Sequence, residues 1–309
     1  MTQPSTIGWD QYVGQDALKK RLKISILSAK RRGERLDPVL LESGMPGVGK
    51  TTMARIIANE LEANIVELVP PFKAEDVASV ADQLNDGDVL FIDEVHKLAD
   101  GGKRGAEILL KLLEDGTVQV DGETIKLPDV TVIAATTDAD KLPEPVLDRF
   151  KIRPHFERYT VENMVSITEV FAQRHGVEFS DELVNTIATA SRFTPRVIEG
   201  FIMAARDLEA VEEREPTPDE LLEFEGVTRD GLSLKHQAYL TSLLEQQRHR
   251  RGVLVCEAGE TLLCNLLRET RQGVQRIERY LMELGYVERT NSGRALSQAG
   301  ITRAQQLVG

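Results

Sequence analysis

The amino-acid sequence predicts an α/β fold with a parallel sheet, followed by a helical lid domain and a C-terminal winged helix. Three observations support this prediction. Short apolar runs alternate with helical patterns over residues 1–155. Strand patterns then fade over residues 156–227, where apolar residues recur at helical spacing. Residues 228–309 combine three short helical patterns with an Arg-bearing ribbon that turns at glycine, which is typical of a winged helix. We therefore expect three domains with these boundaries, and a linker at residues 226–231.

Composition sets the broad class of the protein. The chain has 309 residues, of which 41% are hydrophobic, enough for two or three globular domains. No apolar run approaches the ~18 residues that a membrane span needs. The N-terminal residues lack the basic start and apolar core of a secretory signal. Cys256 and Cys264 lie in a predicted helical region, where two buried free thiols are favoured over a disulfide. We expect a cytoplasmic protein.

The charge of the chain is unevenly distributed. The net charge is −12, but residues 228–309 contain twelve basic and eight acidic side chains. This module is therefore positive by +4, and residues 1–227 carry −16. A basic module on an acidic body favours a polyanionic partner for that module.

The main chemical motif is Gly44–Thr51, which reads Gly-x-x-x-x-Gly-Lys-Thr between an apolar run at 39–41 and a helical pattern at 53–61. Its glycines are Gly44, Gly47 and Gly49. Without Cβ atoms, such a loop can curl and direct its N–H groups at a phosphate. Lys50 can then reach the β- and γ-phosphates, and the Thr51 hydroxyl can ligate Mg²⁺. This context favours nucleotide binding over a Gly-rich turn that binds nothing.

A second motif ends the apolar run 89–92. Asp93 and Glu94 follow this run, and the carboxyl ends of parallel strands face the ligand crevice of an α/β sheet. Asp93 would hold Mg²⁺, and Glu94 would polarise the water that attacks the γ-phosphate. Alone, an Asp-Glu pair after an apolar run is a functionless surface feature about as often as it is functional. Its place after a phosphate loop favours the catalytic interpretation.

Three further polar sites have alternative interpretations from the residues alone. The pair Thr136-Thr137 ends another apolar run and either contacts a γ-phosphate or bonds local backbone. Arg149 is either a surface arginine or a cation supplied to the nucleotide of a neighbouring copy. Arg196 follows Thr194-Pro195 at a helix start, where it either reaches back to the nucleotide or is solvated.

Residues 117–127 alternate apolar and polar side chains around Asp121-Gly122, which predicts a β-hairpin. Its tip is polar. The hairpin is either a simple structural element or an arm that docks a partner.

The C-terminal module contains arginines that suit phosphate contacts, which give affinity without reading sequence. They are Arg268, Arg271, Arg276, Arg279, Arg289 and Arg294. The alternatives are a solvated arginine face and a wing that docks protein.

Across nearly the whole chain these motifs resemble the RuvB family, the bacterial Holliday-junction branch-migration ATPases of the AAA+ class. The segments that carry the resemblance are Tyr12–Gln15, Gly44–Thr52, Leu90–Leu98, Ala135–Thr137, Asp148–Phe150, Thr194–Arg196, Arg289-Thr290 and Gly293-Arg294. The phosphate loop alone is generic, whereas the Asp-Glu-x-His-Lys-Leu run, Thr-Pro-Arg and the winged-helix tail in that order are specific.

The resemblance implies a role for each matched residue. Tyr12, Val13 and Tyr159 would line the adenine pocket. Gly47, Lys50, Thr51 and Thr52 would bind phosphates and Mg²⁺, beside the carboxylates Asp93 and Glu94. Thr137, rather than Thr136, would sense the γ-phosphate, and Arg196 would be the lid sensor. Arg149 would act on the adjacent subunit of a hexameric ring, and Arg289 and Arg294 would contact the DNA backbone.

The resemblance therefore implies an ATPase and DNA helicase that moves duplex or four-way-junction DNA in recombination and repair. A RuvA-like partner does not follow so directly, because the hairpin is shorter than the family's and its tip is polar. Phe193 replaces a glycine usual before Thr-Pro-Arg, and the Arg-Pro pair usual before Tyr12 is missing. The alternatives are an AAA+ loader of a sliding clamp or replicative helicase, and a nucleotide-dependent DNA-binding regulator with little turnover.

Overall fold

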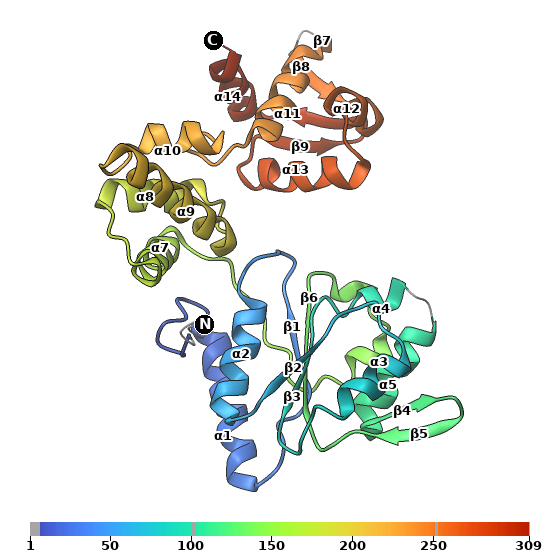
Figure 1. Cartoon of the computed structure of the whole chain (residues 1–309). Helices are drawn as coiled ribbons and strands as arrows, with labels where there is room; N and C mark the ends of the chain where they lie inside the picture. Colours follow the sequence, from blue (N-terminus) through green and yellow to red (C-terminus); the bar gives the residue numbers. More distant parts are fainter. Residues whose placement is uncertain (1–6, 101–102, 251–252, 309) are drawn as a thin grey trace. The chain divides into compact units, whose positions relative to one another are not determined.

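The chain divides into two compact units. The computed structural model describes residues 7–100, 103–250 and 253–308 (Figure 1). The first unit runs to Val170 and includes Phe193–Val197; the second contains Phe171–Arg192 and the chain from Ile198 onward. The predicted helical region is thus shared between the two units. The division into three domains at residues 155 and 227 stays a prediction. Ser5 and Thr6, which stand near the position of the missing Arg-Pro pair, lie outside the described residues.

The first unit is built on a parallel sheet. Its strands are β1 (Val39–Glu42), β2 (Ile65–Leu68), β3 (Val89–Ile92) and β6 (Thr131–Thr136), in the order β1-β6-β3-β2. Leu41 lies opposite Ala135, and Ala134 lies opposite Ile92. Strands β1, β3 and β6 read as nearly continuous apolar runs because both faces of a parallel sheet are covered. The predicted α/β class is confirmed.

Helices cover both faces of this sheet (Figure 1). They are α1 (Asp16–Arg32), α2 (Lys50–Leu61), α3 (Ala74–Ala81), α4 (Lys97–Asp100), α5 (Lys103–Asp115) and α6 (Glu144–Leu147), with a 3₁₀ turn at Ala139–Lys141. Alternate strand residues face opposite layers. Leu40, Leu90 and Ile92 therefore pack with α3 and α5, whereas Leu41 and Phe91 point to the other face and are fully buried.

The predicted hairpin is present as β4 (Thr117–Val120) and β5 (Glu123–Lys126). Asp121 and Gly122 connect the strands with φ angles of 49° and 87°, the positive values that a two-residue type I′ turn requires. Val118 at its base is buried in the same core as α5. The hairpin is therefore anchored at one end and exposed at its tip.

The second unit contains the lid helices and the winged helix. Its helices and strands are α8 (Asp181–Ala190), α10 (Pro218–Glu225), α11 (Leu234–Glu245), β7 (Gln247–Arg250), β8 (Val253–Ala258), α12 (Glu260–Leu267), α13 (Arg271–Glu283), β9 (Val287–Thr290), β10 (Gly293–Leu296) and α14 (Gln298–Val308). Helices α7 (Val161–His175) and α9 (Pro195–Glu212) each contribute residues to both units. The winged-helix sheet has the antiparallel order β7-β8-β10-β9.

The two cysteines of the second unit differ from expectation, one in its secondary structure and the other in its burial. Cys256 lies in strand β8, not in a helix, because Val253–Ala258 pairs with both β7 and β10. Cys256 is buried and Cys264 half-buried, and both are free thiols. Within the described ranges, no helix is long and apolar enough to cross a membrane.

The segment predicted as a linker, residues 226–231, is tied into the winged helix. The Asp230 carboxylate accepts hydrogen bonds from Arg303 Nε (2.9 Å) and Nη2 (2.7 Å) and from the Tyr286 hydroxyl (3.0 Å). A Cβ on Gly231, whose φ is +76°, would lie 2.8 Å from the Ala190 carbonyl oxygen. The joint between α8 and the winged helix therefore leaves no room for a side chain at residue 231.

A buried histidine lies beside this joint. The Nδ1 atom of His236 accepts the Ser233 backbone N–H (3.2 Å), and its ring meets the Tyr280 ring edge-on, with 5.5 Å between centroids. Burial, together with the positive charge of Arg192, lowers the pKa of His236 to about 4. The folded protein therefore contains the neutral ring at neutral pH.

This shift predicts a pH-dependent stability. The pKa of an unfolded histidine is 6.5, so the unfolded state binds more protons between pH 4 and 6.5. Stability is present above pH 6.5 and is lost as pH falls towards 4, by on the order of 3 kcal/mol. Urea unfolding followed by circular dichroism between pH 7.5 and 4.5 measures it. His236→Gln should flatten this dependence, whereas His155→Gln, at an exposed site, should not. An equal slope in wild type and His236→Gln would contradict the assignment.

Candidate active site

Three strand ends meet at the carboxyl edge of the first unit's sheet. Strand β1 leads into the glycine-rich loop, β6 ends at Thr136, and β3 is followed by Asp93 and Glu94. Since β6 lies between β1 and β3, the polar residues after these strands are brought to one place. This edge is where ligands bind in open α/β sheets.

The glycine-rich loop has a backbone that only glycine adopts readily. Gly47 and Gly49 have φ angles of 75° and 96°. A Cβ on Gly49 would lie 2.6 Å from the Tyr12 hydroxyl, and one on Gly47 would lie 2.8 Å from Thr194 Cγ2. No side chain caps the first N–H groups of α2, which follows directly. The loop therefore leads directly into a helix N-terminus that its N-cap residue, Gly49, does not cap with a side chain, an arrangement that suits an anion.

Two buried tyrosines donate hydrogen bonds to the backbone of this loop. The Tyr12 and Tyr159 hydroxyls donate to the Val48 carbonyl oxygen, at 3.1 and 3.0 Å. Burial raises the pKa of both phenols, so they remain protonated donors. Val13, next to Tyr12, is half-buried. The structure thus brings Tyr12 and Tyr159 to the phosphate loop, and their role in an adenine pocket stays a prediction.

Lys50 lies inside the loop with only 6% of its surface exposed. Burial lowers the pKa of its ammonium group; Glu94 and Asp93 oppose this shift, and Arg196 adds to it. These through-space effects place both carboxylates and Arg196 near Lys50. The Cβ of Arg196 would also lie 3.2 Å from a Cβ at Gly47. Arg196 therefore lies beside the phosphate loop although its side chain is exposed, and its contact with a nucleotide stays a prediction.

The Thr51 hydroxyl donates to Asp93 Oδ2 at 3.3 Å. Hydroxyl and carboxylate oxygens are the ligands that Mg²⁺ prefers, so this pair fits a magnesium ion shared with nucleotide phosphates. Among the described residues, no group of three or more His, Cys, Asp or Glu side chains could hold a metal ion by itself. An ion here would take nucleotide phosphates and waters as further ligands, the usual arrangement for Mg²⁺.

The carboxylate of Glu94 is held by two neighbouring residues, Thr137 and His96. Its φ is +50°, which is uncommon for a residue with a side chain and often marks a functional position. The Thr137 hydroxyl donates to Glu94 Oε2 at 2.9 Å, and His96 Nδ1 lies 3.2 Å from the same oxygen. Thr136 is fully buried, and its Oγ1 accepts the Asp138 N–H. Thr137 is thus the threonine that contacts Glu94.

His96 lies in the Asp-Glu-x-His-Lys-Leu run, but the sequence alone predicts no role for its side chain. It is buried, with Nδ1 2.9 Å from Thr136 Oγ1 as well as close to Glu94. An N–H at Nδ1 can donate to both oxygens and orient the carboxylate. Only the spatial adjacency of β3 and β6 reveals this contact.

Comparison with known proteins identifies the family. The model of the Holliday junction DNA helicase RuvB P-loop domain matches residues 3–156, and that of the RuvB C-terminal winged helix domain matches residues 229–304. The Holliday junction branch migration complex subunit RuvB of Lactobacillus johnsonii is 35% identical over 93% of this chain and 86% of its own length. The chain belongs to the RuvB family.

Other members agree. The subunit RuvB of Streptococcus pneumoniae is 35% identical over 92% of this chain and 87% of its own length. The solved structure of the Thermotoga maritima RuvB Holliday junction branch migration motor has a TM-score of 0.80 at 32% identity, covering 96% of this chain and 97% of that one. The resemblance and the winged helix predicted from the sequence are confirmed.

Arg149, the arginine that the resemblance implies acts between subunits, takes no part in the contacts described at the edge of the sheet. Arg149 follows α6 and pairs with Glu114 at the end of α5. None of its hydrogen bonds involves Lys50, Asp93 or Glu94. The described contacts of Arg149 are thus with Glu114, and its role between subunits stays a prediction.

The two arginines implied to bind DNA differ in their surroundings. Arg289 is 67% exposed, and its nearest carboxylate oxygen lies 3.9 Å away on Glu278. Arg294 is 14% exposed and donates to Glu278 Oε1 (2.7 Å) and Glu260 Oε1 (3.0 Å). The Tyr239 hydroxyl also donates to the buried Glu278. Arg294 thus links the wing to α12 and α13, whereas Arg289 is open to solvent.

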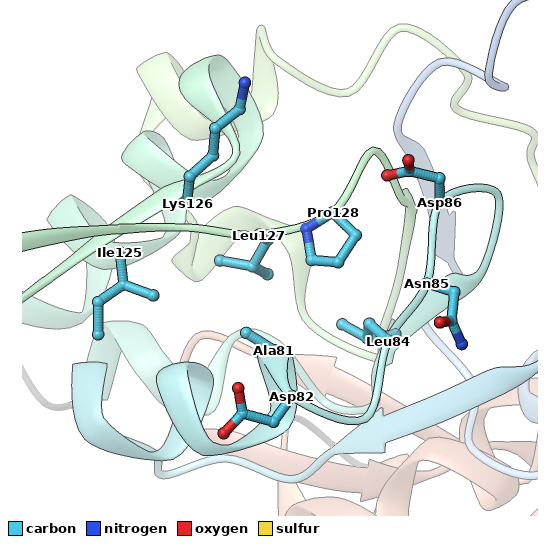
Figure 2. A pocket seen from close by; sticks show the side chains of 9 residues that line it. All are labelled: Ala81, Asp82, Leu84, Asn85, Asp86, Ile125, Lys126, Leu127 and Pro128. Atoms are coloured by element: carbon cyan, nitrogen blue, oxygen red, sulfur yellow. The ribbon is translucent and has the colours of Figure 1, made fainter.

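A cavity elsewhere in the first unit does not belong to the nucleotide edge (Figure 2). It has a volume of about 510 Å³ and is lined by residues 81, 82, 84–86 and 125–128. Asn85 and Asp86 precede β3, and Pro128 precedes β6, so the cavity lies at the amino ends of these strands. Ligands of open α/β sheets bind at the opposite ends.

The packing of Gly49 predicts a specific loss. Gly49→Ala adds a Cβ that would clash with the Tyr12 hydroxyl and strains a positive φ. We expect ATP affinity to fall at least ~10-fold, because the loop donors are displaced. Isothermal titration with a non-hydrolysable ATP analogue measures this. Gly200→Ala, where a Cβ meets open space, should bind as wild type. Unchanged affinity in Gly49→Ala would show that this close approach is not needed.

Proposed function

We propose that this protein is an ATP-driven DNA motor that hydrolyses MgATP in a hexameric ring and drives branch migration of four-way junctions. The observation that carries the proposal is the group formed by Lys50, Thr51, Asp93, Glu94 and Thr137 at one edge of the sheet. The named relatives are subunits of the Holliday junction branch migration complex. The intact Glu94 favours turnover over a regulator that only binds nucleotide.

Each residue has a distinct task in this proposal. Gly44, Gly47, Gly49, Lys50 and Thr52 bind the triphosphate, and Arg196 contacts it from the lid side. Thr51 and Asp93 would ligate Mg²⁺, which neutralises charge on the β- and γ-phosphates when bound. Glu94 orients and polarises the attacking water, and Thr137 couples the γ-phosphate to Glu94. Tyr12, Val13 and Tyr159 surround the base. Catalysis is then mainly positioning and charge stabilisation.

Arg149 completes the site of a neighbouring subunit. A cation facing the transferred phosphoryl group stabilises the charge that develops there. Because the hydrogen bonds and ion pairs of Arg149 within the described residues do not involve its own copy's Lys50 or Glu94, the proposal assigns it to the adjacent nucleotide. The protein must therefore self-associate for full activity.

The winged helix provides the DNA grip, and the motor acts on duplex DNA in the cytoplasm. Arg289 contacts backbone phosphates directly, and Arg294 contributes by fixing the wing that carries Arg289. A RuvA-like partner is not part of this proposal. The hairpin positions Thr117, Gln119, Thr124 and Lys126 are polar, as is its tip, so this face of the described hairpin offers no apolar side chain for docking.

The first test measures DNA-stimulated phosphate release and dissociation of a synthetic four-way junction in parallel. Lys50→Ala, Glu94→Gln and Arg149→Ala should each lower both activities by ~100-fold or more, because each removes a positioned charge. Arg55→Ala, an exposed residue of α2, is the control. Junction dissociation that persists without phosphate release would refute the motor. Phosphate release without any action on the junction would instead support a loader.

The second test separates the two wing arginines. Arg289→Ala should weaken duplex binding and reduce the slope of log affinity against log salt by about one, since one phosphate contact is lost. Arg294→Ala should also destabilise the second unit, because the buried Glu278 loses the nearer of its two arginine partners. Fluorescence anisotropy over a salt series and thermal melting measure these effects, with Arg206→Ala as control. A salt-independent affinity in wild type would contradict a phosphate grip.

A further inference from the structure

The surroundings of Arg149 point to a residue that acts through it. Arg149 follows the short helix α6, and Glu114 lies in the last turn of α5, which is in contact with α6. Arg149 Nε donates to Glu114 Oε1 at 2.6 Å, and Arg149 Nη2 donates to the same oxygen. One carboxylate oxygen thus binds one edge of the guanidinium group.

This arrangement leaves the other edge of the guanidinium available. Arginine has five N–H donors in a rigid plane. Glu114 uses the edge formed by Nε and Nη2, and Nη1 makes no hydrogen bond to any residue in the described part of the chain. The side chain is about 39% exposed. A bond on one edge fixes the plane and therefore also the direction of the free edge.

We propose that Glu114 is a positioning residue that orients Arg149, so that its Nη1 edge reaches the nucleotide of the adjacent subunit. This inference rests on the proposed role of Arg149 between subunits. A long arginine side chain without a tether loses rotamer freedom each time it engages a phosphate. Glu114 removes much of that cost in advance, which is pre-organisation of the kind that raises a rate.

A purely structural ion pair is the competing explanation. Both partners are more than a third exposed, and exposed ion pairs contribute little to stability. Loss of Glu114 should therefore leave the fold and the melting temperature nearly unchanged. The same reasoning makes Glu114→Gln a suitable variant, since it keeps the size of the side chain and is expected to fold.

The first measurement is steady-state ATP hydrolysis with duplex DNA present. Glu114→Gln should lower kcat by roughly 3- to 10-fold, the expected effect of one arginine that is no longer pre-ordered, while KM for ATP stays within twofold. Glu107→Gln, at an exposed position on the same helix without an ion pair among the described contacts, should behave as wild type. Glu114→Gln combined with Arg149→Ala should be no slower than Arg149→Ala alone.

The second measurement mixes subunits. A Lys50→Ala subunit has no working nucleotide site but still presents Glu114 and Arg149 to its neighbour. Mixing it with Glu114→Gln subunits should raise hydrolysis per intact site above that of Glu114→Gln alone. A residue that served its own subunit's nucleotide would show no such gain.

The outcomes separate this inference from the proposed function. Normal turnover in Arg149→Ala would refute the role of Arg149 itself. An inactive Arg149→Ala with wild-type kcat in Glu114→Gln would refute only the positioning role. A faster Glu114→Gln would also refute it, since Glu114 would then restrain Arg149. A slow Glu114→Gln with a lowered melting temperature and no gain on mixing would indicate a structural pair.

Discussion

The parallel register of β1, β6 and β3 is the constraint on which the rest of the site depends. Backbone hydrogen bonding in this order aligns Leu41 with Ala135 and Ile92 with Ala134. The next residues along each strand are then the phosphate loop, Thr136-Thr137 and Asp93-Glu94. No side-chain interaction is needed to bring these groups together. The apolar strand residues that stabilise the sheet thereby also determine where the charged residues meet.

Around this edge, packing defines the shape of the loop and the orientation of the carboxylates. The Tyr12 and Tyr159 hydroxyls bind the Val48 carbonyl, and Tyr12 has space to do so because Gly49 has no Cβ. On the other side, Thr137 and His96 hold Glu94 Oε2. The site is thus rigid on both sides, which favours catalysis by positioning.

Much of this arrangement could be predicted from sequence, because its signals are local. The phosphate loop, the apolar strand before Asp93 and the Asp121-Gly122 turn each combine a motif with its own flanking pattern. Contacts between distant segments could not be predicted in the same way. The pairs Glu114–Arg149 and His96–Thr136 join residues 35 and 40 positions apart, and no periodicity links them.

The winged helix shows the same limit. Strand β8 includes Cys256 and resembles a buried helix segment, because a short apolar run fits either structure. The linker prediction failed to anticipate that Asp230 would be fixed by Arg303, 73 residues later. The family resemblance implies that Arg294 contacts DNA. Its ion pairs with Glu260 and Glu278 are found only in the three-dimensional structure.

The most direct test of the central claim is an experimental structure of the assembled protein with Mg²⁺ and a non-hydrolysable ATP analogue. The account predicts a triphosphate along Gly47–Thr52, with Mg²⁺ at Thr51 and Asp93 and the γ-phosphate beside Thr137. It also predicts that Arg149 of the adjacent copy faces this phosphate. Nucleotide bound elsewhere, or an Arg149 remote from every nucleotide in the assembly, would contradict the account.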